Sequence, residues 1–219
     1  MSVNVEQYQQ LSAALTADGV TLVAVSKTKP VEDIQALYAL GQRDFGENYV
    51  QELVDKQAVL PQDIRWHFIG HLQSNKVKYI APFVHLIHGV DSLKLLKEID
   101  KQAAKNNRVI NCLLQVHIAS EETKFGMDEH ELTEAISQLH LFPNVKVAGL
   151  MGMASFSNDE TKVRNEFKVL HQLLIKSAIS DPTSAILSMG MSGDYKIAIE
   201  EGSTMVRIGS LLFGARNYA

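Results

Sequence analysis

The sequence contains little cysteine, no long apolar run and no block of like charge. Its single cysteine, Cys112, lies in an apolar stretch, which excludes an intramolecular disulfide framework and predicts a small, inert side chain. No apolar stretch approaches the roughly 20 residues that a membrane span requires. The net charge of -4 comes from interspersed acidic and basic residues, without the basic stripe of a nucleic-acid-binding protein. We therefore expect neither a membrane span nor a nucleic-acid partner.

Two further absences concern export signals and metal ligands. Residues 1–15 lack the charged segment and the continuous apolar segment of an export signal, so we expect a cytoplasmic protein. The histidines and the lone cysteine show neither the H-x-x-x-H spacing nor the Cys/His spacing of a metal site. No metal is therefore predicted.

The dominant pattern is a short apolar strand followed by a helical segment, repeated without a low-complexity linker. The helices are expected at 31–40, 49–59, 93–106, 129–140, 159–177 and 195–201, with an additional helix before the first strand. The eight strands are expected at 22–26, 44–47, 66–70, 86–90, 110–118, 145–151, 185–189 and 205–209.

Eight strand-helix units predict an α/β fold, a single (β/α)8 TIM barrel that spans residues 1–219 as one domain. The strands lack strict polar alternation, as expected for a parallel sheet covered by helices, and eight is the number at which such a sheet closes. A doubly wound open sheet is the alternative. It is disfavoured because no G-x-G-x-x-G follows the first strand, which ends instead in the segment 26–30, SKTKP.

Polar residues gather at the carboxyl ends of the predicted strands, where barrels of this type hold their working residues. Such a rim suits a polar, anionic ligand. In strand order the residues are Lys27, Asn48, His71, Asp91, His117, Ser155, Ser188 with Ser192, and Arg207 with Ser210.

Lys27 directly follows the apolar run of the first strand. In the mouth of a barrel its amine would be partly desolvated, which lowers the pKa of a lysine and favours Schiff-base chemistry. The alternative is an ordinary solvated lysine at a strand end, and Lys29 is the natural competitor.

Two small, N–H-rich turns follow the seventh and eighth strands, where phosphate sites recur in this architecture. The first, 188–194 (SMGMSGD), reads as a phosphate cradle because its glycines let backbone N–H groups approach an anion. An ordinary turn capped by Ser192 or Asp194 is the alternative. The second, 207–210 (RIGS), contains Arg207 in an otherwise apolar strand, so its guanidinium must have a partner. That partner is either a ligand or a nearby carboxylate.

Long, ordered motifs in this chain closely resemble those of the pyridoxal phosphate homeostasis protein family, over nearly its whole length. That family is similar in fold to the barrel domain of alanine racemase, the fold-type III group of proteins that bind pyridoxal 5′-phosphate (PLP). The motifs are 24–30 (AVSKTKP), 45–52 (FGENYVQE), 66–76 (WHFIGHLQSNK), 149–153 (GLMGM), 187–194 (LSMGMSGD) and 206–209 (VRIG).

The resemblance implies a role for each rim residue. Lys27 would form the Schiff base with PLP, Arg207 would face the pyridine nitrogen, and Asn48 would lie beside the ring. A permanent cation near that nitrogen discourages its protonation and weakens the ring as an electron sink. Lys124 fits the family too, either as a transient PLP contact or as a simple loop lysine. The cofactor-binding set is completed by Ser188 and by the residues expected around the phosphate, Ser192, Gly193, Gly209 and Ser210.

Three functions are compatible with a Schiff-base lysine at position 27. The resemblance favours a carrier that buffers PLP or delivers it to PLP-dependent apoenzymes, without strong catalytic activity, as a monomer or weak dimer. A PLP-dependent amino-acid racemase is the alternative, but it needs a tyrosine from a separate β-domain, for which we expect no room after Tyr218. A sugar-phosphate enzyme that uses Lys27 as aldolases do is the third possibility.

Overall fold

The computed structural model describes residues 3–121, 125–177, 179 and 184–214. Lys124 lies outside the described residues. Eight parallel strands pair in sequence order, and β8 pairs with β1 to close the barrel. The strands are β1 (Thr21–Val25), β2 (Asp44–Glu47), β3 (Arg65–Phe68), β4 (Leu86–Val90), β5 (Ile110–Gln115), β6 (Val145–Met151), β7 (Ile186–Ser188) and β8 (Met205–Ile208).

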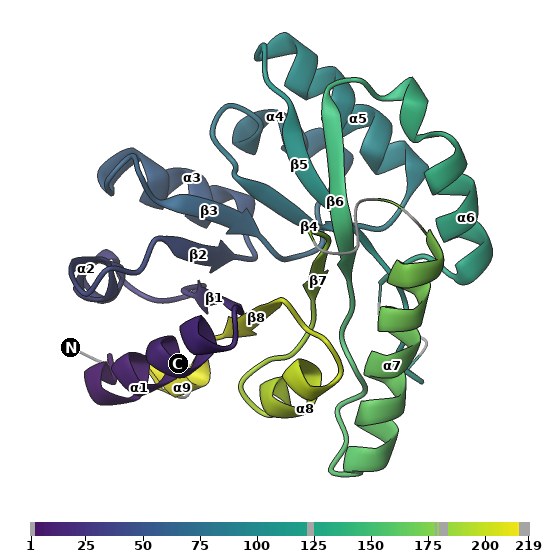
Figure 1. Ribbon diagram of the computed structural model, residues 1–219. Coiled ribbons are helices and arrows are strands. Elements are labelled where there is room, and N and C mark those ends of the chain that lie inside the picture. Colours follow the sequence, from purple (N-terminus) through teal and green to yellow (C-terminus); the bar gives the residue numbers. More distant parts are fainter. Residues whose placement is uncertain (1–2, 122–124, 178, 180–183, 215–219) are drawn as a thin grey trace.

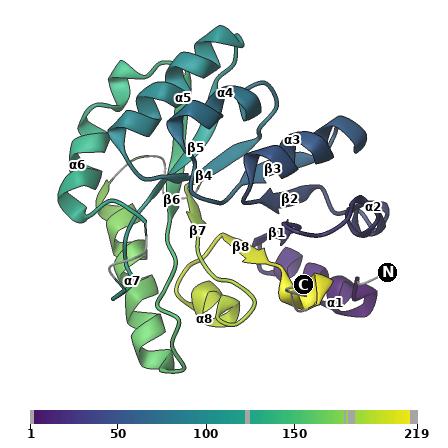
Figure 2. The same ribbon diagram turned by 180° about the vertical axis from the view of Figure 1, so that it is seen from behind.

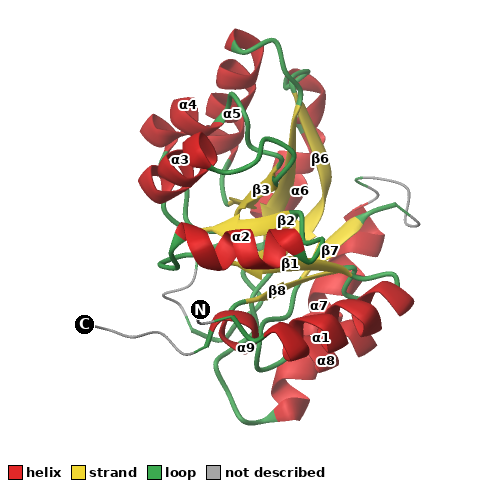
Figure 3. Ribbon diagram, turned by 90° about the vertical axis from the view of Figure 1, so that its left-hand side faces the viewer, coloured by secondary structure: helices red, strands yellow, loops and turns green. Residues whose placement is uncertain are grey.

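Helices surround the strands on the outside of the barrel, as the red and yellow ribbons of Figure 3 show. The predicted TIM barrel is therefore confirmed. The α-helices are α1 (Val5–Ala17), α2 (Val31–Ala39), α3 (Val50–Val59), α4 (Val77–Ile80), α5 (Leu93–Lys105), α6 (Glu129–Ser137), α7 (Glu160–Ser177), α8 (Tyr195–Glu200) and α9 (Ser210–Phe213), with the 3-10 helices η1 (Ser74–Lys76) and η2 (Leu139–Leu141).

The strands divide their side chains between the barrel interior and the helices, because successive residues of a strand point to opposite faces. Val23, Leu86 and Leu113 belong to a small apolar cluster inside the barrel. Their neighbours Ala24 and Ile87 belong instead to the large core between strands and helices. This alternation fixes which polar residues of each strand also face inward.

The additional N-terminal helix, α1, is confirmed. Its first turn is capped by Asn4, whose side chain accepts the backbone N–H of Gln7 at 3.0 Å. The backbone N–H of Asn4 donates to the carbonyl of Leu212 at 2.8 Å. Helices α1 and α9 consequently lie side by side, which both ribbon views show (Figures 1 and 2).

Several expected boundaries were wrong by a few residues. The fifth strand was expected to reach residue 118 but ends at Gln115, because Val116 forms only an isolated bridge with Met127. The helix expected at 129–140 is an α-helix only to Ser137 and then tightens into η2. The short elements η1, α4 and α9 were not predicted, since three or four residues are too few to show helical periodicity. Among the described residues, no helix is both long enough and apolar enough to cross a bilayer.

Candidate functional site

Lys27 stands at the carboxyl end of β1. Val23 of the same strand belongs to the interior cluster, and Val25 lies against the β8 turn, where a Cβ added to Gly209 would be 3.4 Å from the Val25 Cβ. Side chains two residues apart in a strand point to the same face, so Lys27 follows Val23 and Val25 on the inward face; Lys27 is partly buried. The lysine therefore belongs to the mouth of the barrel, beside β8.

Lys29 is held on a different side of the turn. Its Nζ donates to the carbonyl of Phe213, at the end of α9, at 2.8 Å. That contact satisfies one of the carbonyls that a helix leaves unpaired at its end. Lys29 consequently serves to hold α9 against β1, and the competition between the two lysines favours Lys27 as the site residue.

The turn that carries Lys27 has a strained backbone. The N–H of Lys29 donates to the carbonyl of Ser26 at 3.0 Å, and Thr28 between them has a φ of +62°. A β-branched residue rarely adopts a positive φ, because its side chain crowds the backbone there. The N–H of Thr28 donates to Glu52 Oε1 of α3 at 2.6 Å, which anchors the turn.

A buried polar cluster between β1, β2 and α3 supports this turn from outside the barrel. Lys56 Nζ donates to the Ser26 carbonyl and to Glu47 Oε1, both at 2.8 Å, and to Glu52 Oε1 at 2.7 Å. The Ser26 hydroxyl donates to Glu47 Oε1 at 2.6 Å. We call Ser26, Glu47, Glu52 and Lys56 the outer network. Burial raises the pKa of Glu47 to about 7 even though Lys56 opposes the shift.

The two N–H-rich turns after β7 and β8 are in direct contact. The N–H of Gly209 donates to Ser192 Oγ at 3.3 Å. Among the described residues, no protein acceptor takes the backbone N–H of Ser192, Gly193 or Ser210. Space around Gly193 is open, since an added Cβ would meet nothing within 4 Å. The two turns thus present free N–H donors side by side, which is the geometry that an anion requires.

Asn48 follows β2 on the inward side of the strand. Gly46, two residues earlier, faces the interior, because a Cβ there would lie 3.0 Å from Val23 Cγ1. Asn48 also lines a cavity of about 570 Å³ at the rim, together with Phe68, His71 and Lys76. That cavity lies towards α3 and η1, so only the alternation of β2 from Gly46 supports an inward position for Asn48.

Arg207 of β8 is buried inside the barrel. Its NH1 group donates to Ser188 Oγ at 2.6 Å, and its NH2 group donates to the Gly152 carbonyl at 3.1 Å. In the part of the chain that the structure describes, no carboxylate forms an ion pair with it. Burial lowers the pKa of Arg207 to about 10, so the guanidinium remains charged at neutral pH. Ser188 is fully buried beneath Arg207, and its hydroxyl oxygen accepts the hydrogen bond from the guanidinium.

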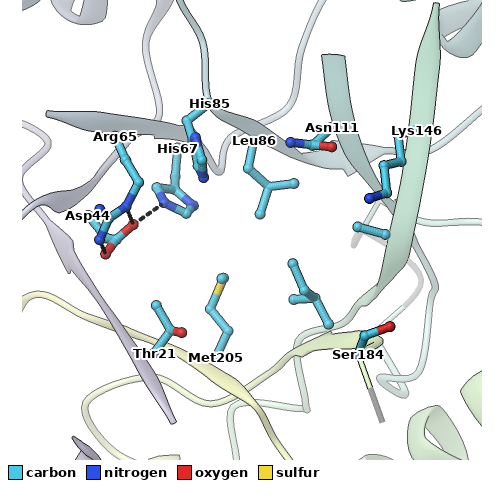
Figure 4. Close-up of a pocket in the computed structure, with 12 residues that line it drawn as sticks. Thr21, Asp44, Arg65, His67, His85, Leu86, Asn111, Lys146, Ser184 and Met205 are labelled. Atoms are coloured by element: carbon cyan, nitrogen blue, oxygen red, sulfur yellow. Dashed lines mark hydrogen bonds and ion pairs between the residues drawn. The ribbon is translucent and has the colours of Figure 1, made fainter. Parts of the chain in front are cut away.

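The opposite mouth of the barrel holds a second pocket, of about 410 Å³ (Figure 4). Arg65 donates from Nε to Asp44 Oδ1 at 2.7 Å and from NH2 to the other oxygen of that carboxylate. His67 Nε2 lies 3.0 Å from Asp44 Oδ1. One ligand atom from each of Asp44, His67 and His85 lies within 4.8 Å of the others, a spacing that an ion could use. Asp44 and His67 already satisfy each other, so we assign no ion there, and the prediction of no metal stays a prediction.

The rim residues are among those predicted from the sequence, whereas the outer network and the cluster of Asp44, Arg65 and His67 are not. His67 is buried, and its Nε2 lies within hydrogen-bonding distance of Asp44 Oδ1. A usable signal was present, because Asp44 and His67 are ionisable residues inside two successive apolar strands.

Comparison with known proteins gives consistent matches over almost the whole chain. Residues 4–217 match the family model for the alanine racemase N-terminal domain. A protein of Aquifex aeolicus named pyridoxal phosphate homeostasis protein is 44% identical over 201 residues, covering 90% of this chain and 87% of that protein. A protein of the same name from Escherichia coli strain K12 is 39% identical over 222 residues, covering 96% and 94%.

Solved structures agree with these matches. PipY of Synechococcus elongatus without PLP has a TM-score of 0.89 and 36% identity, covering 95% of this chain and 99% of PipY. PipY with PLP bound has a TM-score of 0.86 at the same identity and the same coverage. Alanine racemase of Bartonella henselae is 18% identical with a TM-score of 0.70, and this chain covers 59% of it. At that identity the likeness shows the fold alone.

Proposed function

This chain belongs to the pyridoxal phosphate homeostasis protein family, and we propose that it binds PLP as a Schiff base on Lys27 and buffers or delivers the cofactor inside the cell. The observation that carries the proposal is the contact between the β7 and β8 turns beside the lysine-bearing end of β1. The solved structure of its relative PipY with PLP bound supports the same cofactor.

The residues at the rim fit the chemistry of this cofactor. Among the described residues no acceptor takes the N–H groups of Ser192, Gly193 and Ser210, and such donors suit a phosphate; Gly209 of the second turn lies against Val25 of β1. Asn48 is the neighbour of the ring on the β2 side. Ser188 supports Arg207 rather than the phosphate, since its hydroxyl is already bonded below the guanidinium.

Arg207 fits a role in which the bound cofactor is only a weak electron sink. When bound, the cofactor supplies a reactive aldehyde and an electron-withdrawing ring. A guanidinium beside the ring nitrogen donates a hydrogen bond but gives up no proton, so the ring stays a weak electron sink. The recipients of the cofactor are PLP-dependent apoenzymes, and the carrier acts as a monomer or weak dimer.

The decisive experiment is borohydride reduction of the PLP-loaded protein followed by peptide mapping. Reduction fixes the cofactor on whichever lysine holds it, and we expect the label on Lys27. Lys27→Ala should lose the visible absorption band of the bound cofactor, whereas the matched variant Lys29→Ala should keep it. A label on Lys29 in the wild-type protein, or an unchanged band in Lys27→Ala, contradicts the assignment.

Racemisation is the competing function, because the family model that matches is that of alanine racemase. Exchange of the α-proton of amino acids with deuterated solvent separates the two. A carrier should exchange it only slowly. Turnover at the rate of an ordinary enzyme, on the order of 10 per second, would establish the racemase.

A further inference from the structure

The buried Arg207 and the pocket at the opposite mouth of the barrel are physically connected. We propose that a one-way chain of hydrogen bonds through the barrel interior orients the guanidinium of Arg207 toward the ring nitrogen of the cofactor. This rests on the proposed function, which puts the cofactor beside Arg207. We call its four positioning residues the inner chain: Asp44, His67, His88 and Ser188.

Each link of the inner chain is within hydrogen-bonding distance. His67 Nε2 lies 3.0 Å from Asp44 Oδ1, and His67 Nδ1 lies 2.9 Å from His88 Nε2. His88 Nδ1 lies 3.0 Å from Ser188 Oγ, which accepts from Arg207 at 2.6 Å. Both histidines and the serine have at most 1% of their surface exposed. Water therefore does not compete for these bonds, and the chain joins β2, β3, β4, β7 and β8.

The two ends of the inner chain fix the direction of every bond between them. A guanidinium can only donate, and an ionised carboxylate can only accept. Ser188 therefore accepts from Arg207 and passes its own hydroxyl proton toward His88 Nδ1. His88 donates from Nε2 to His67 Nδ1, and His67 donates from Nε2 to Asp44. In this arrangement every donor finds one acceptor, and both histidines are neutral with the proton on Nε2.

The electrostatics of the chain agree with this assignment. Burial would raise the pKa of Asp44, but hydrogen bonds from His67 and Arg65 outweigh burial and lower that pKa, so the acceptor end is ionised. Burial lowers the pKa of His88 far below its usual value, and the positive charge of Arg207 acts in the same direction. A neutral His88 is what the direction of the chain requires.

The chain also answers how the buried guanidinium of Arg207 is accommodated. A buried charge is costly unless it is paired and hydrogen-bonded, and among the described residues Arg207 has only a hydroxyl and a carbonyl as acceptors. Consecutive hydrogen bonds polarise one another, so an anionic end strengthens the acceptor at the other end. Asp44 thus acts on Arg207 through three neutral groups. That leaves the rest of the guanidinium available to the cofactor.

The first test examines the protein without PLP. NMR of protein labelled in its histidine side chains should show His67 and His88 as neutral Nε2–H tautomers, with assignments from His67→Gln and His88→Gln. A doubly protonated His67, or an Nδ1–H tautomer of either ring, overturns the directed chain. This outcome does not depend on whether PLP binds.

The second test measures PLP affinity and the visible spectrum of the bound cofactor. Ser188→Ala removes the link next to Arg207 and should weaken PLP binding about tenfold, the equivalent of one hydrogen bond to a charged group. It should also shift the absorption band, because the contact to the ring nitrogen changes. Asp44→Asn, at the far end, should shift the band in the same direction by a smaller amount.

Leu113→Ala is the matched control, because Leu113 is an equally buried, inward-facing residue of β5 in the apolar cluster. It should lower stability but leave the affinity and the band unchanged. The proposal is overturned if Ser188→Ala keeps both wild-type values, or if Leu113→Ala shifts the band as much as Ser188→Ala does. Failure of the wild-type protein to take up PLP would instead contradict the proposed function, and the tautomer test would still stand.

Discussion

The pKa values of the two carboxylates in the four-residue strand β2 are shifted in opposite directions. Asp44 faces into the barrel, and its pKa is lowered because hydrogen bonds from His67 and Arg65 outweigh its burial. Glu47 faces out toward α3, and burial raises its pKa to about 7. Both belong to polar networks that serve the same rim: the inner chain leads to Arg207, and the outer network supports the turn of Lys27.

The difference lies in how completely each carboxylate is hydrogen-bonded. Both oxygens of Asp44 accept bonds, from Arg65 on each oxygen and from His67 on one. Glu47 accepts two bonds on Oε1, but its buried Oε2 has no partner among the described residues. Hydrogen bonds to the charged form favour ionisation, while desolvation opposes it. Burial alone therefore does not predict the charge of a carboxylate; its count of donors does.

Of the changes that test this difference between the two carboxylates, Asp44→Ala should have the largest effect on stability. It leaves His67 with an unsatisfied buried N–H and Arg65 without its anion, which should lower the free energy of unfolding by about 3 kcal/mol. The midpoint of urea unfolding measures the loss. Asp63→Ala is the matched control, because Asp63 pairs with Arg43 at the surface and its side chain is 57% exposed. That change should cost far less, because solvent screens an exposed ion pair, and equal losses would contradict the special role of Asp44.

Glu47→Gln should remove a pH dependence that the wild-type protein shows. A raised pKa in the folded state means that the folded protein holds a proton that the unfolded chain has already released. The contribution of Glu47 to stability is therefore complete below pH about 4.5 and lost as the pH rises toward 7. We expect the free energy of unfolding to fall by on the order of 3 kcal/mol over this window.

Unfolding of the wild-type protein and Glu47→Gln at several pH values checks this expectation. The variant should have the flatter profile, since an amide does not titrate. Glu52→Gln is the comparison, because Glu52 belongs to the same network and its carboxylate is partly exposed. The expectation is contradicted if the free energy of unfolding of the wild-type protein rises between pH 4.5 and 7 while that of Glu47→Gln stays constant. That result would show that Lys56 keeps Glu47 ionised.

The barrel and its rim could be predicted from the sequence because they depend on local patterns. Each strand is a short apolar run, and residues such as Lys27 and Asn48 come directly after one, so they must meet at one edge of a parallel sheet. The contact between the turns of Ser192 and Gly209 follows from the adjacency of β7 and β8. Neither inference needs side-chain geometry.

The two networks could not be predicted because they depend on which face each polar residue occupies. Glu47 and Asp44 are three residues apart on one strand and therefore point to opposite faces. Whether Lys56 reaches Glu47 depends on the rotation of α3 about its axis, and the contact between His67 and His88 depends on the stagger between β3 and β4. Only the folded barrel fixes these relations.

The smallest effect is expected at Thr28, whose backbone has a strained, positive φ and is held in place by Glu52 of the outer network. Glycine adopts a positive φ without steric cost, so Thr28→Gly should raise the free energy of unfolding by about 0.5–1 kcal/mol, after the greater freedom that glycine gives the unfolded chain is subtracted. The bond from the Thr28 N–H to Glu52 is retained in the variant. Asn107→Gly is the matched control, because Asn107 also has a positive φ, of 51°, yet asparagine tolerates this conformation. Thermal unfolding should show a smaller gain in stability for Asn107→Gly than for Thr28→Gly. If Thr28→Gly lowers stability instead, the threonine side chain itself holds the turn, and the outer network is not sufficient to fix Lys27.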